Sequence, residues 1–160
     1  MDNVKKMSAT VENRDATAAT DTKLVDSVWW TLRMSFGLVP LLAGLDKFFN
    51  LMTHWPKYVA PALASALPVT PQQFMYGVGV IEIVAGLAVL LSPWTKLFAY
   101  VVAAWLAGIA LNLIAGGFYD IAVRDLVMAV SAISLARLTD VVHVPSAARH
   151  VVRQAAVGSA

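Results

Sequence analysis

Four apolar segments, each near the length of a membrane-spanning helix, follow one another along the chain. They cover residues 28–45, 74–91, 97–118 and 119–138. A helix that crosses the hydrocarbon core of a bilayer needs about 20 mostly apolar residues. The pattern predicts an all-α protein, an integral membrane four-helix bundle over residues 27–139 with the lipid bilayer as its surroundings.

The segments outside these four are more polar. Residues 51–72 hold four prolines around the sequence VAPALASAL, which predicts a short interfacial helix bounded by prolines in the first external loop. Residues 1–26 lack the apolar core of a signal peptide, and we expect a disordered cytosolic tail there. For residues 140–160, two alternatives stay open, a disordered cytosolic tail and a basic amphipathic helix on the membrane surface.

The distribution of positive charge predicts the orientation of the bundle. If the amino terminus lies in the cytoplasm, most Lys and Arg residues fall on the cytoplasmic side, and Lys57 is alone in the first external loop. Membrane proteins favour this excess of positive charge inside. We therefore expect both termini in the cytoplasm of a cell whose plasma membrane holds this multi-pass protein.

Composition narrows the classes of function. The 160 residues are 59% hydrophobic, and four spans leave no room for a separate soluble catalytic domain. The chain has no cysteine, which excludes disulfides and thiolate-bound iron–sulfur clusters. Its net charge is only +2 and is scattered, so nucleic acid is not an expected partner. The histidines His54, His143 and His150 all lie outside the apolar segments, so we expect no intrinsic haem or metal.

Two nonapeptides in the first and second segments resemble each other. GLVPLLAGL begins at Gly37 and GVIEIVAGL begins at Gly79, on segments expected to run in opposite directions. Inverted repeats build some transporters. Nine small and aliphatic residues match too easily by chance to indicate such a repeat here.

Ionisable residues within the apolar segments are the candidates for chemistry, because charge inside a bilayer is costly. Glu82 lies near mid-depth, and Asp125 lies in the outer part of the fourth segment. Both are candidates for proton handling. By depth, Arg33 and Arg124 can each reach Glu82 from opposite sides, while Asp125 is expected to pair with Lys47. The alternative is that these groups only form structural pairs between helices.

Further candidates form the remainder of a predicted ligand-binding pocket in the outer half of the bundle. Asp46 and Lys47 close the first segment, where snorkelling to the interface is the alternative explanation. Asn112 lies on a stripe of small residues and is suited to a hydrogen bond between helices. Trp105 is either packing material or a platform for a planar ligand. Asp120 and Arg124 are spaced to pair along one helix face.

The order and spacing of three segments resemble those of the DoxX-like family of small four-helix membrane proteins. They read LRMSFGLVPLLAGLDKFFN, GVIEIVAGLAVLL and YDIAVRDLVMAVSAISLARL, and span residues 30–138. That family includes the DoxD-type subunit of thiosulfate:quinone oxidoreductase. The resemblance implies a prokaryotic plasma membrane protein tied to quinone-linked oxidation. The absence of cysteine speaks against a thiosulfate role.

The leading hypothesis is a membrane subunit of a quinone-linked electron-transfer complex, with Glu82 and Asp125 handling protons. In it, Arg33, Arg124 and Lys47 stabilise anionic forms and Asn112 binds a ring carbonyl. Quinone is then the cofactor, redox centres come from other membrane subunits, and a homo-oligomer is compatible. The competing hypothesis is a non-catalytic scaffold of a larger membrane complex. A small-anion or proton conduit is a third, weaker alternative.

Overall fold

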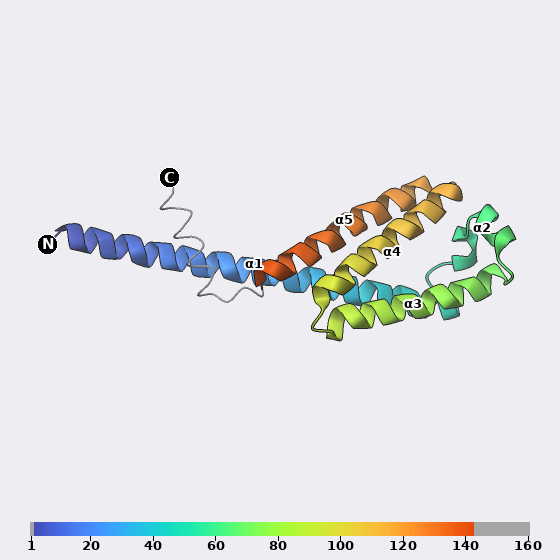
Figure 1. Cartoon of the computed structure of the whole chain (residues 1–160), viewed down its shortest axis with the longest axis horizontal. Coiled ribbons are helices and arrows are strands. Elements are labelled where there is room, and N and C mark those ends of the chain that lie inside the picture. The colour runs from blue at the N-terminus through green and yellow to red at the C-terminus, as the bar shows by residue number, and fades with distance from the viewer. Residues whose placement is uncertain (1, 143–160) are drawn as a thin grey trace.

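The computed structural model describes residues 2–142, and these residues are helical over most of their length (Figure 1). In chain order the elements are α1 (Asp2–Phe49), the 3-10 helix η1 (Trp55–Tyr58), α2 (Pro61–Ala66), α3 (Pro71–Leu91), α4 (Thr95–Ala115) and α5 (Tyr119–Val142). The predicted all-α class is confirmed. The predicted surface helix beyond residue 142 lies outside the described residues.

Three helices are long and apolar enough to cross a membrane. They are the stretch Glu12–Phe49 of α1, together with α3 and α4. The chain is therefore a multi-pass membrane protein. Helix α5 is long enough but is not among these candidates, because charged residues recur along it. Its membrane crossing stays a prediction.

Helix α1 is much longer than the predicted first span. It begins at Asp2, so residues 2–26 are helical where the sequence predicted a disordered tail. The physical reason is that neither proline nor glycine occurs before Gly37, and the stretch is rich in Ala, the best helix former. Thr10, Thr17, Thr20 and Thr22 donate hydrogen bonds to backbone carbonyls four residues earlier, so their hydroxyls are satisfied within the helix.

The long helices form two antiparallel pairs. Helix α1 packs along α3, and α4 packs along α5, while the contacts between the two pairs are fewer. Figure 1 shows the α4–α5 pair diverging from the α1–α3 pair toward the end where residues 50–70 lie. We call this the loop end, and the opposite end, where residues 92–94 join α3 to α4, the turn end.

The turn end holds the largest core. It joins all four long helices through Trp29 and Phe36 of α1, Val89 of α3, Val102 of α4 and Leu135 of α5. The indole nitrogen of Trp29 also donates a hydrogen bond to Thr139 Oγ1 at 2.8 Å. The two pairs are therefore fastened together at this end.

Helices α1 and α3 approach closely at glycines. A Cβ atom added to Gly44 would lie 2.7 Å from the carbonyl oxygen of Gly79, and the reverse substitution gives the same distance. A Cβ on Gly86 would lie 2.5 Å from the carbonyl oxygen of Gly37. Gly37 and Gly79 are the first residues of the two similar nonapeptides, and Gly44 and Gly86 are the last but one. The two nonapeptides therefore face each other. Small residues of this kind let helix backbones meet in membranes.

The connection between α1 and α3 fills the space between the pairs at the loop end. Val59 packs with Met75 and Val78 of α3, and Leu63 of α2 lies against this cluster. Tyr58 packs at the cluster formed by α4 and α5, with its ring 5.0 Å from that of Phe118. The predicted short helix is present as α2, with Pro61 in its first turn. The connection thus acts as a wedge that supports the divergence of the helix pairs.

Candidate functional site

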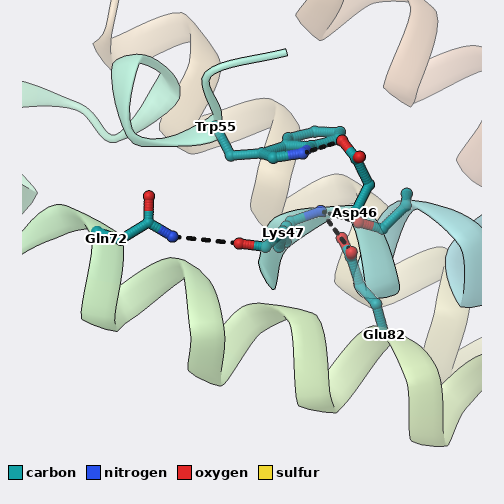
Figure 2. Close-up of polar contacts among 6 residues, drawn as sticks. Asp46, Lys47, Trp55, Gln72 and Glu82 are labelled. Carbon is teal, nitrogen blue, oxygen red and sulfur yellow. Dashed lines mark hydrogen bonds and ion pairs between the residues drawn. The ribbon is translucent and has the colours of Figure 1, made fainter. Parts of the chain in front are cut away.

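A buried ion pair between α1 and α3 is the centre of the candidate site (Figure 2). Lys47 Nζ lies 2.5 Å from Glu82 Oε2, and the two side chains are 4% and 9% exposed. The pair depends on the glycine crossing, because Gly79 lies against the Cβ of Lys47 and Gly44 against the Cβ of Glu82. Larger residues there would separate the two backbones and their charged groups.

An indole covers the ammonium group of Lys47. Lys47 Nζ lies 3.8 Å from the centre of the Trp55 ring, a cation–π contact. Figure 2 shows the lysine side chain between the Trp55 ring and the Glu82 carboxylate. The ammonium also lies 3.4 Å from the carbonyl oxygen of Ala43. Lys47 is therefore enclosed and does not snorkel to the membrane surface, the alternative that its position in the sequence left open.

Asp46 holds the covering indole in place. Its carboxylate accepts hydrogen bonds from Trp55 Nε1 at 2.8 Å and from the backbone N–H groups of Leu51 and Met52. Helix α1 ends just before, where Asn50 takes the left-handed conformation with φ 53°. Asp46 thus orders the start of the loop.

Helix α3 contributes a second polar contact to the same corner. Gln72 Nε2 donates to the backbone carbonyl of Lys47 at 3.1 Å, and Gln72 Oε1 accepts from Asn50 Nδ2 at 3.0 Å. The capping box of Thr70 and Gln73 begins α3 immediately before this point. Gln72 therefore fixes the register of α1 against α3 near the ion pair.

Trp105 of α4 lies near the ion pair and also lines a groove on the outside of the helices. Its indole nitrogen is buried near the Glu82 carboxylate but lies outside hydrogen-bond geometry, and has no other partner in the described chain. The groove has a volume of about 350 Å³ and is lined by Ile81, Ala85, Val101, Ala104 and Trp105. It opens on the exposed faces of α3 and α4, where the two helix pairs diverge.

Asp125 and Arg124 do not join the ion pair by direct contact. Asp125 is half-buried on α5 and interacts electrostatically with Lys47 and with Glu82, but it forms no ion pair in the described chain. Arg124 is exposed and forms no ion pair with Glu82. The predicted pairs Lys47–Asp125 and Arg124–Glu82 are therefore wrong. Glu82 of the adjacent helix α3 forms the ion pair with Lys47 instead.

Arg33 also takes a different partner from the one predicted. Its guanidinium donates to the backbone carbonyls of Val89, Leu90 and Ser92 at 2.9, 2.9 and 3.0 Å, at the carboxyl end of α3. The last carbonyls of a helix have no partners within it and carry partial negative charge. They lie closer to Arg33 than Glu82 does, so the arginine fastens the turn end and does not clamp Glu82.

Asn112 binds the connection between α1 and α3 and not another long helix. Its Nδ2 donates to the carbonyl of Tyr58 at 2.7 Å, and its Oδ1 accepts from the N–H of Ala60 at 3.0 Å. The expected hydrogen bond between helices is wrong for this residue. Backbone groups of the connection bind both polar atoms of the amide, so Asn112 holds the wedge against α4.

The sequence alone did not identify Trp55 and Gln72 as members of the site. Both lie outside the predicted spans. The one signal in the sequence that could have indicated a contact with the end of α1 is the aromatic ring of Trp55, which lies a few residues after the first span. The described residues hold no group of three or more His, Asp or Glu side chains that could bind a metal ion. What the site offers chemically is one buried ammonium, the carboxylate of Glu82 paired with it, the buried carboxylate of Asp46 and the half-buried carboxylate of Asp125.

Comparison with known proteins gives one match. The family model described as DoxX matches residues 28–116, more than half of the chain, from the second half of α1 through α4. No curated protein and no solved structure matches the chain.

Proposed function

The chain belongs to the DoxX family, and from this membership and the site we propose that it is a membrane subunit of a quinone-linked electron-transfer complex. The proposal includes a prokaryotic plasma membrane and partner subunits that carry the redox centres. It also takes α5 as a fourth span, with both termini in the cytoplasm.

The observation that carries the proposal is that one indole, Trp105, lies near a buried acid–base pair and also lines a groove on the outer faces of α3 and α4. A lipid-soluble ring reaches such a groove from the bilayer without passing through water. Pockets for small molecules begin at about 300 Å³, and the groove is of this size. Its apolar lining and the nearby polar pair fit a molecule with an apolar tail and a polar ring.

A bound quinone accepts two electrons and two protons and becomes a quinol. In this proposal partner subunits supply the electrons, and the contribution of this chain concerns protons and charge. The Lys47 ammonium donates a hydrogen bond to the Glu82 carboxylate, and a change of charge in the groove would alter the strength of this pair. Asp125 adds a second carboxylate within electrostatic reach.

A specific observation also favours a second candidate, the non-catalytic scaffold. Arg33, Asp46 and Asn112 all use their polar atoms to fasten segments of this chain. Three of the predicted ligand-binding residues therefore stabilise the fold of this chain. In the scaffold alternative, the Lys47–Glu82 pair does the same and fixes only the register of α1 against α3.

The variant Glu82→Gln separates the two candidates in native membranes. It keeps the shape of the side chain and an acceptor for Lys47, but removes the charge and the exchangeable proton. A proton-handling role predicts a loss of quinone-dependent turnover per assembled complex of about 100-fold, the scale of acid–base catalysis. The exposed Lys96–Asp140 pair offers a matched control, Asp140→Asn, which is expected to leave turnover unchanged. Lost assembly with full turnover per assembled complex would favour the scaffold.

The groove is tested by filling it. Ala104→Phe places a ring in the space lined by Trp105 and Ile81, and we expect the KM for quinone to rise at least about tenfold. Leu111→Phe is the control, because Leu111 is 68% exposed on the same helix and does not line the groove. An equal KM for both variants would remove the groove from the proposal.

A further inference from the structure

The indole N–H of Trp105 is a buried donor without a partner. Its Nε1 atom is hidden from solvent, and no acceptor within residues 2–142 lies in hydrogen-bond geometry with it. Such donors are rare in folded proteins, because the group loses its hydrogen bond to water and gains none in return. The position is therefore favourable only if a small movement of the ring brings the N–H to an acceptor.

The Glu82 carboxylate is the acceptor within reach. The indole N–H of Trp105 lies beside this carboxylate and interacts with it, although the geometry falls short of a hydrogen bond. Lys47 binds Oε2 of Glu82, and within the described part of the chain Oε1 accepts no hydrogen bond. A carboxylate accepts several hydrogen bonds, whereas an indole N–H can only donate. The free oxygen and the free N–H are therefore complementary.

The Trp105 ring is less confined on one side than on the others. It is partly buried and forms one wall of the groove of about 350 Å³, whose remaining walls are apolar side chains of α3 and α4. Elsewhere the ring packs against the cluster of Val59, Met75 and Val78. The groove is thus the side toward which the ring has space to move. Any group that fills the groove removes this freedom.

We propose that Trp105 is a positioning residue that couples the groove to the ion pair. A molecule in the groove confines the indole against Glu82, and the N–H of Trp105 then donates a hydrogen bond to the carboxylate oxygen that Lys47 does not bind. Glu82 is then held by two donors, one from α1 and one from α4. Binding in the groove and the arrangement of the pair thereby influence each other, because such coupling is reciprocal.

This inference deepens the proposed function and rests on it, since quinone is the molecule proposed for the groove. The coupling itself requires only volume in the groove, because the side chains that line it beside Trp105 are aliphatic. An introduced aliphatic side chain that fills the groove should therefore act on the indole as a bound molecule does. The role of Trp105 can thus be tested without quinone.

NMR of the full chain in lipid nanodiscs, with the tryptophan indoles labelled with ¹⁵N, observes the N–H directly. The chain has five tryptophans, and Trp105→Phe identifies the signal of Trp105 by its loss. Ala104→Leu and Val101→Met each add aliphatic volume to the groove without placing a new ring near the indole. In both variants we expect the signal to move downfield, and its exchange with deuterated water to slow at least about fivefold relative to wild type.

Two controls separate the hydrogen bond from other effects on the signal. Gly108→Leu adds the same side chain to α4 in open space outside the groove, and should leave the signal at its wild-type position. Ala104→Leu combined with Lys47→Met and Glu82→Leu removes the acceptor, so the downfield movement should vanish. A wild-type signal in both groove-filling variants would overturn the inference, and so would a downfield signal that persists without Glu82.

Decylubiquinone added to the wild-type chain tests the link to the proposed function. We expect it to move the Trp105 signal in the same direction as the groove-filling variants do. If those variants move the signal and decylubiquinone does not, Trp105 positions Glu82 and the quinone proposal fails. If decylubiquinone supports turnover in native membranes but neither it nor the variants move the signal, the quinone proposal stands and the inference is overturned.

Discussion

The Lys47 side chain illustrates how a charge is kept stable deep in the bundle. Its ammonium has a carboxylate, a backbone carbonyl and an indole face around it, so each direction of approach is occupied. An isolated ammonium in such a place would cost several kcal/mol, on the order given by ion transfer into protein interiors. Removal of one member leaves the other charge buried without compensation.

This balance predicts that a single substitution in the pair is strongly destabilising, whereas substitution of both residues is not. Lys47→Met alone should lower the free energy of unfolding by about 3–5 kcal/mol, because Glu82 stays buried and unpaired. Lys47→Met with Glu82→Leu should be close to wild type, since apolar residues of similar volume often replace a buried pair at no cost. Thermal unfolding in detergent measures both. A double variant as unstable as the single would show that the pair itself is essential for folding.

Asn112 makes a second prediction at the scale of one residue. Asn112→Ala removes both hydrogen bonds to the connection and leaves the N–H of Ala60 and the carbonyl of Tyr58 without their partner. We expect a loss of about 1–3 kcal/mol and faster hydrogen exchange at the amide of Ala60. Ser131→Ala, which loses only a bond within its own helix, is the control. Unchanged exchange at Ala60 would show that packing alone holds the wedge.

Sequence reasoning located the charged residues of the site but not their partners. The costs of charge in a membrane identified Glu82, Lys47 and Asp46 from their positions alone. Their pairing depends on the register of α1 against α3, which the Gly44–Gly79 contact sets. Arg33 had the reach for Glu82, but free carbonyls at the end of α3 lay nearer. Reach along helix axes cannot decide between partners at similar depth.

At the scale of elements, the crossing of α1 and α3 is the most demanding contact. Gly79→Ala should push the helices apart, since the new Cβ would lie 2.7 Å from a backbone oxygen that has no freedom to move. Overpacking of this kind costs about 1–3 kcal/mol. Gly77→Ala on the same helix meets nothing within 4 Å and should be neutral or slightly stabilising. Equal melting temperatures for the two variants would contradict the close crossing.

Helix positions were predictable because apolar length alone identifies a span. The proline-bounded helix α2 and the break before α3 followed from the prolines in residues 51–72. The start of α1 was not predictable in the same way. Polar composition indicated disorder for residues 2–26, whereas helix propensity without any breaker continues the helix from the span. The two principles conflict there, and the second describes the structure.

At the scale of the whole molecule, the arrangement of the two helix pairs decides where a site can form. A shared core closes the turn end, and the connection holds the pairs apart at the loop end. The predicted outer polar pocket becomes a sealed ion pair beside a groove between α3 and α4. The angle between the two helix pairs could not be predicted from sequence periodicity. It depends on how the connection packs against both pairs. The family match covers residues 28–116 and stops before α5.

The measurement that tests the central claim most directly is quinone-dependent turnover per assembled complex in native membranes that carry Lys47→Met with Glu82→Leu. The double substitution keeps the packing of the site but removes both charges and the proton between them. The account predicts an assembled complex whose turnover falls by about 100-fold. An assembled complex with wild-type turnover would contradict it and leave the ion pair a purely structural role.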